Sequence, residues 1–265
     1  MANPNTSHSN LNDQLVARVE AGDLAGVELL LIQGADPHSY GSYALTRAAA
    51  NGHAECVQLL IPISDPKADN SDALLWAASN GHLECVKLLI PVSDPKANNS
   101  DALVFAAEGG HTGCVALLIP VSDPKADNST ALALAAEEGR VDCVRLLTPV
   151  SDPKALNSIA LRRAACRGQA ECVELLIPAS DPLIDMEGIL SEAAYYGHAK
   201  SFSILVSHEP RLLDGMDLAA TLAAATAAGH SELASLLLSI AEQEELEIEL
   251  APSPTLDARP APLRL

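Results

Sequence analysis

The chain has 265 residues, of which 48% are hydrophobic and only 3% aromatic, and its formal net charge is -19 at pH 7. This length allows one or two ordinary domains with a sizeable core. Binding to nucleic acid or to an anionic membrane surface requires positive charge at the contact, so the composition disfavours both kinds of partner. A protein with a basic surface would be the better electrostatic match.

Residues 1–10, MANPNTSHSN, are polar and lack the apolar stretch of a signal peptide. We expect them to be disordered. Six cysteines in a chain of this length do not predict a disulfide scaffold, so a reducing cytoplasm is the expected location. The composition of the first residues also resembles that of proteins secreted by bacterial type III systems. A secreted effector that binds a host protein is therefore an alternative.

From residue 11 to residue 241 the chain repeats itself about eight times, with a period of 29 residues in its clearest part. A fixed period in this range indicates a stacked-repeat architecture. Glycines, prolines and aspartates keep the interval, and looser copies are centred on Gly22 and Gly229. Five of the six cysteines also keep it, at Cys56, Cys85, Cys114, Cys143 and Cys172.

Each unit reads as two short helices and a turn. In the third unit, residues 84–90 (ECVKLLI) have the apolar spacing of a helix with one buried face, which Pro91 ends. Residues 102–107 (ALVFAA) predict the first helix of the next unit. Between them, Asp94 precedes a proline and is expected to cap backbone N–H groups. Such helix pairs cannot bury their apolar faces alone, so the units must stack.

These patterns resemble the ankyrin-repeat family over about residues 11–240. The segment AGDLAGVELLLIQGAD (residues 21–36) looks like the family's second helix and its G-A-D turn, and A-A-x-x-G-H-x-E-x-V-x-L-L recurs in later units. The resemblance implies an all-α helical-repeat solenoid that binds proteins through a concave groove lined by the first helices, acting as a non-enzymatic scaffold or adaptor. Family repeats have about 33 residues. The shorter unit here predicts shortened fingers between the helix pairs.

A His and a Cys recur three residues apart in several units, at His53/Cys56, His82/Cys85 and His111/Cys114. Equivalent positions of stacked helices lie about 8–10 Å apart. This separation is too large for a disulfide or for tetrahedral zinc coordination. We therefore expect the cysteines to pack in the core and the histidines to occupy turns, with no cofactor. A metal-handling protein remains the alternative.

The predicted concave groove is where the units differ most. At the exposed face of the first helices, Trp76 and Phe105 occupy positions where the family has a half-buried leucine, so core packing is expected and an interface role is the alternative. Tyr195 and Tyr196 replace small or polar residues and favour an interface, because tyrosine, tryptophan and arginine dominate binding hot spots. The predicted partner-binding residues are Trp76, Asn80, Glu108, Glu137, Glu138, Arg162, Arg163, Arg167, Tyr195 and Tyr196.

Cys166 is the one cysteine outside the 29-residue register. Arg162, Arg163 and Arg167 lie within four residues of it. Positive charge lowers the pKa of a thiol, so a reactive, redox-responsive Cys166 is a second functional hypothesis. A small surface residue without such reactivity is the alternative.

The sequence contains no phosphate-binding glycine loop, H-E-x-x-H motif or nucleophile elbow, so we expect no enzyme activity. Residues 242–265 begin with the acidic EQEELEIEL and continue as a Pro-rich segment. We expect a flexible tail here, whose acidic part could extend the last helix as a polar cap. We also expect a monomer.

Overall fold

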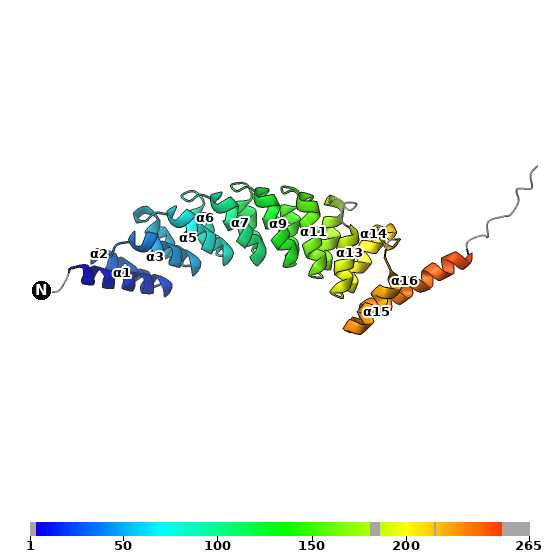
Figure 1. The fold of residues 1–265 in the computed structure, drawn as a ribbon. Coiled ribbons are helices and arrows are strands. Elements are labelled where there is room, and N and C mark those ends of the chain that lie inside the picture. Colours follow the sequence, from blue (N-terminus) through cyan, green and yellow to red (C-terminus); the bar gives the residue numbers. More distant parts are fainter. Residues whose placement is uncertain (1–3, 181–185, 215, 251–265) are drawn as a thin grey trace, which may run out of the picture.

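The computed structural model describes residues 4–180, 186–214 and 216–250. Within these ranges the chain is all helical and forms no strand, and sixteen α-helices stand side by side in eight pairs along an elongated, arched array (Figure 1). The first helices of the pairs are α1 (Pro4–Glu20), α3 (Ser39–Ala50), α5 (Ala68–Ser79), α7 (Ala97–Gly109), α9 (Ala126–Glu137), α11 (Ala155–Cys166), α13 (Met186–Tyr195) and α15 (Leu218–Ala228).

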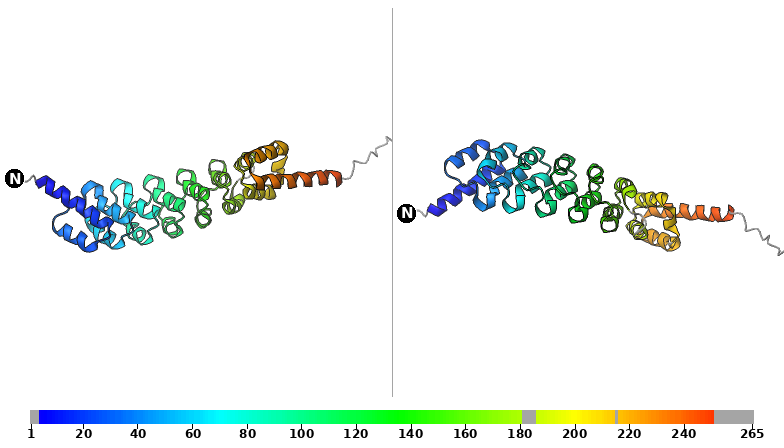
Figure 2. Two further views of the ribbon diagram at one scale, coloured as in Figure 1. Left: turned by 90° about the horizontal axis from the view of Figure 1, so that it is seen from below. Right: turned by 90° about the horizontal axis from the view of Figure 1, so that it is seen from above.

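The second helices are α2 (Leu24–Ile32), α4 (Ala54–Leu60), α6 (Leu83–Leu89), α8 (Thr112–Leu118), α10 (Val141–Leu147), α12 (Ala170–Leu176), α14 (Ala199–His208) and α16 (Ser231–Leu250). First helices pack on first helices and second helices on second helices, so the array has two layers (Figure 2). Each unit therefore contacts mainly its neighbours, as in other solenoids. None of the described helices is both long and apolar enough to cross a membrane.

The core is a continuous ladder of small and branched apolar side chains. The register cysteines are buried free thiols, each part of this ladder. Leu45, Leu74 and Leu103 recur one unit apart and are fully buried. The helices can lie close together because alanines fill most of the remaining core positions, which explains the low aromatic content.

The histidines of the G-H turns join adjacent units. The Nε2 atom of His82 donates a hydrogen bond to the carbonyl oxygen of Ala50, the last residue of α3, at 3.0 Å. The last carbonyls of a helix have no partner within it, so each such bond gives one of them a partner from the next unit. Equivalent bonds join His53 to Glu20, His111 to Ser79, Arg140 to Glu108, Gln169 to Glu137 and His198 to Cys166.

Gly52 is required beside this bond. Its φ of +75° lies in the left-handed region, and a Cβ there would lie 2.5 Å from Nδ1 of His82. Arg140 and Gln169 replace histidine without losing the bond, because each also carries an N–H donor. The histidine therefore acts as a donor between units, which is a more specific role than the turn position expected from the sequence.

Short turns replace the fingers expected of a longer repeat. After α4, the 3-10 helix η1 (Ile61–Ile63) leads into the turn at Asp65, whose Oδ1 accepts a hydrogen bond from the backbone N–H of Lys67 at 2.9 Å. Asp94 accepts the backbone N–H of Lys96 in the same way at 3.0 Å. The expected capping of backbone N–H groups by the turn aspartates is thus confirmed. The buried Ser42 hydroxyl of the preceding unit accepts the N–H of Asp65 at 2.8 Å, which ties the turn to its neighbour.

Both ends contain more helix than the sequence predicted. Residues 4–10, expected to be disordered, form the beginning of α1, where Pro4 suits a first helical position because it has no N–H to satisfy. The helix is held by Leu15 and Val19, which are fully buried. Residues 242–250, at the start of the predicted flexible tail, form the last part of α16. Residues 251–265 lie outside the described residues.

Candidate protein-binding face

The exposed surface of the first helices, which we call the first-helix face, carries most of the predicted binding residues. Trp76 and Phe105 are 44% and 38% exposed, so the expectation that they pack in the core is wrong. The leucines two residues before each of them, Leu74 and Leu103, already fill the core. The two aromatic rings are consequently left on the surface of adjacent units, α5 and α7.

Asn80 has a structural role. Its side-chain amide donates a hydrogen bond to the carbonyl of Ala50 at 2.9 Å, the same oxygen that accepts the bond from His82. This side chain therefore helps to join α3 to the next unit. Glu108 on α7 and Glu138 after α9 lie further along the same face, half-buried and exposed respectively.

An ion-pair network lies in the middle of the face. Glu137 accepts hydrogen bonds from Arg163 at 2.6 Å and from Arg167 at 2.7 Å, which links α9 to the end of α11. The hydrogen bond from Arg167, against the opposing effect of desolvation, holds the pKa of the Glu137 carboxyl below its usual value. Arg162 binds both carboxylate oxygens of Glu192 on α13, at 3.0 and 3.1 Å.

Cys166 belongs to this network, with the opposite consequence to the one predicted. Its Sγ donates a hydrogen bond to Oε2 of Glu192 at 2.6 Å. Burial, together with that carboxylate, raises the pKa of the Cys166 thiol to about 12. The contacts do not favour an activated thiolate, because two of the nearby arginines are bound to Glu137 and the third brings Glu192 against the sulfur.

Two tyrosines lie beyond the network at the end of α13. Tyr195 is 77% exposed and Tyr196 is 54% exposed. Their rings meet edge to face with centroids 5.1 Å apart, and the Tyr196 ring also stacks on His198 at 6.2 Å. The pair therefore presents an aromatic surface that is largely exposed to solvent.

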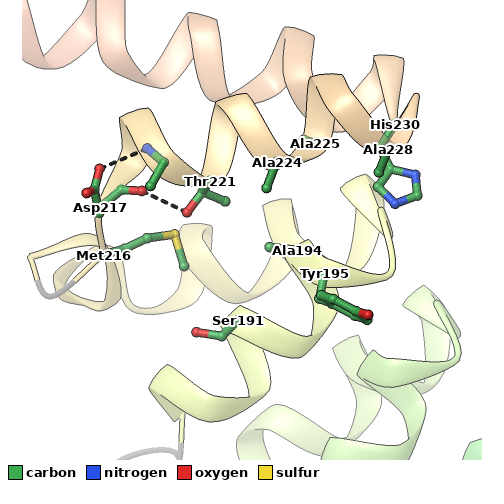
Figure 3. Close-up of a pocket in the computed structure, with 11 residues that line it drawn as sticks. Ser191, Ala194, Tyr195, Met216, Asp217, Thr221, Ala224, Ala225, Ala228 and His230 are labelled. Atoms are coloured by element: carbon green, nitrogen blue, oxygen red, sulfur yellow. Dashed lines mark hydrogen bonds between the residues drawn. The ribbon is translucent and has the colours of Figure 1, made fainter.

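Tyr195 also borders a pocket of about 670 Å³ between α13 and α15. Figure 3 shows Tyr195 and His230 at one end, Met216 and Asp217 at the other, and α15 above Ser191. The α15 side chains facing the space are Ala220, Thr221, Ala224 and Ala228, which are too small to fill it. The carboxylate of Asp217 caps α15 through the N–H of Ala220 at 2.9 Å. A largely apolar cleft with one carboxylate at its rim can hold an apolar side chain next to a basic one.

Sequence reasoning missed the pocket and Glu192 as a binding partner of Cys166. A signal for the pocket existed in LAATLAAATAA (residues 218–228), where alanine occupies seven of the eleven positions. Within the described residues no three His, Cys, Asp or Glu side chains lie together as a metal site would need.

The family model described as ankyrin repeats (3 copies) matches residues 15–99 and 92–157. These matches cover more than half of the chain, and the observed helix pairs continue the same arrangement beyond them. The protein therefore belongs to the ankyrin-repeat family, whose members are generally non-enzymatic scaffolds for protein–protein interaction. A search of curated proteins found no match to this sequence.

Proposed function

We propose that this protein is an adaptor that binds another protein through the first-helix face, without catalysis of its own. The observation that carries the proposal is the set of exposed aromatic side chains on the first helices or directly after them, namely Trp76, Phe105, Tyr195 and Tyr196. Exposed rings of this kind are the usual anchors of protein interfaces. The pocket beside Tyr195 adds a concave site for one anchoring side chain.

The proposed partner presents a basic surface, and the protein binds it as a monomer in the cytoplasm. Arg162, Arg163 and Arg167 are already bound to carboxylates of the array, so they offer little uncompensated positive charge to a partner. The net charge of -19 makes the chain as a whole acidic, which favours a partner with a basic surface. Six free cysteines support a reducing location.

Capture from a cell lysate with matched variants tests this function. The test variant is Trp76→Ala/Tyr195→Ala on the first-helix face. The control is Leu29→Ala/Ile32→Ala, which removes two exposed apolar side chains from α2 in the other layer. A protein retained by the wild type and by the control, lost by the test variant, and bound directly after purification is the expected result. Equal retention by all three would refute the assignment of the face.

A further inference from the structure

A second pocket, of about 300 Å³, lies at the other end of the array and is lined by Asp13, Val16, Tyr40 and Tyr43. Asp13 and Val16 belong to α1, and the tyrosines belong to α3, so the pocket is formed between two first helices. Both tyrosines are exposed. Their positions break the repeat, because Asp69 and Asp72 replace them in the next unit.

One of the two tyrosines already has a cation beside its ring. The guanidinium of Arg47 lies over the Tyr43 ring, 5.8 Å from its centroid. The same guanidinium donates to Oε1 of Glu20 at 2.7 Å. Because Glu20 neutralises Arg47, that cation does not prevent a second one from approaching the tyrosines.

On the acidic side of the pocket, the carboxylate of Asp13 is available to bind a ligand. The Tyr40 hydroxyl reaches Oδ1 of Asp13 only at 3.4 Å, longer than a good O–H···O bond, so most of the carboxylate's acceptor capacity is unused. Asp69 lies close by, since a Cβ on Gly41 would be 2.6 Å from its Oδ2. Neither Asp13 nor Asp69 forms an ion pair within the described part of the chain.

The backbone holds Tyr40 in a strained conformation. Its φ and ψ are 54° and 41°, in the left-handed region that a bulky residue seldom adopts. The equivalent positions in the next three units carry Asp69, Asn98 and Asp127, whose short polar side chains suit this conformation better. Tyr40 therefore places an aromatic ring at the pocket in spite of a strained backbone.

We propose that this pocket binds an arginine side chain of a partner protein, with the guanidinium between the tyrosine rings and the Asp13 carboxylate. A guanidinium suits this site because it stacks on aromatic faces and donates hydrogen bonds to carboxylates in the same plane. The Val16 methyl groups provide a surface for the aliphatic part of the side chain. This inference rests on the proposed function, because it takes the partner to be a protein, and it specifies one residue that the partner must present.

The test is a titration of the full chain with two short peptides, followed through the NMR signals of the tyrosine rings. The probes are acetyl-Gly-Arg-Gly-amide and its citrulline analogue, which has the same shape without the charge. We expect saturable shifts of the Tyr40 and Tyr43 signals with the arginine peptide, and binding at least about tenfold weaker with citrulline. Equal binding of the two peptides, or no saturable shift with either, would overturn the inference.

Variants identify the site. Asp13→Asn should weaken binding of the arginine peptide several-fold, whereas Glu55→Gln, the same loss of charge on the exposed surface of α4, should not. Tyr40→Asn should also weaken binding while preserving the fold, since Asn98 occupies the equivalent position. A Glu55→Gln effect equal to that of Asp13→Asn would refute the site. The titration contains no natural partner, so failed capture from a lysate would count against the proposed function alone, and failed peptide binding against this inference alone.

Discussion

The thiol of Cys166 and the carboxylate of Glu192 are hydrogen bonded at 2.6 Å, from Sγ to Oε2, across the junction of α11 and α13. Arg162 binds the same carboxylate through two nitrogens, so its charge is directed to Glu192. The sulfur therefore faces a negative group although three arginines lie near it in the sequence. This arrangement decides the chemistry of the one cysteine outside the repeat register.

Cys166 should be an unreactive thiol. A pKa raised from 9.0 to about 12 reduces the thiolate fraction at pH 8 by about a thousandfold. We expect native protein to react at Cys166 with iodoacetamide at least about a hundred times more slowly than free cysteine. Peptide mass spectrometry after timed quenching would measure the rate. Glu192→Gln should increase it, because a neutral amide repels the thiolate less, and an unchanged or lower rate would contradict this explanation.

The histidine that donates a hydrogen bond between units should be replaceable by another side chain with an N–H donor. His82→Leu removes the hydrogen bond to the Ala50 carbonyl, and we expect it to lower the free energy of unfolding by about 1 kcal/mol. His82→Gln should lose much less, because Gln169 makes the equivalent bond in another unit. Urea unfolding followed by circular dichroism would compare the variants. Equal losses for leucine and glutamine would show that the imidazole contributes through packing instead.

Leu156 should be a site where substitution stabilises the array. Its φ is +45°, in the left-handed region, although its side chain is largely exposed and has little packing to lose. The equivalent Asn98 suits this conformation better, so Leu156→Asn should raise the free energy of unfolding by about 1 kcal/mol. Leu238→Asn is the matched control, at an exposed position of the regular helix α16, and should be neutral or destabilising. A stability gain at both positions would refute the backbone explanation.

The network at Glu137 should make stability depend on pH in the acidic range. The folded-state pKa of Glu137 is lowered, so its contribution is present above the unfolded value near 4.5 and is lost as the pH falls through the folded value. We expect Glu137→Gln to cost about 1 kcal/mol at pH 7 and progressively less below pH 4.5. Urea unfolding at several pH values would measure the difference. A difference that grows on acidification would have the wrong sign.

The fold was largely predictable because the information recurs along the chain. The 29-residue period of Cys56 and its equivalents, the G-H turns and the prolines after the second helices each mark the same unit. About eight helix pairs, short turns and buried cysteines were all expected. The N-terminal helix was not, because residues 4–10 look disordered in isolation and gain their order from a helix fixed by Leu15 and Val19.

The candidate binding face was only partly predictable. Position within a unit placed Tyr195 and Tyr196 on the first helices, but exposure of Trp76 depends on which neighbour fills the core, here Leu74. The proximity of Glu192 to Cys166 depends on how α11 and α13 are packed, since the two residues lie in different units. A pocket between α13 and α15 depends likewise on the spacing of two helices, which no single segment encodes.

Site-specific photo-crosslinking with a captured and purified partner tests most directly whether the partner binds the first-helix face. The photoreactive residue p-benzoylphenylalanine would replace Tyr196 or Trp76 on the first-helix face, or Leu29 on α2 as the control. We expect a covalent adduct with the partner from Tyr196 and Trp76 and none from Leu29. An adduct from Leu29, with none from either first-helix position, would contradict this expectation.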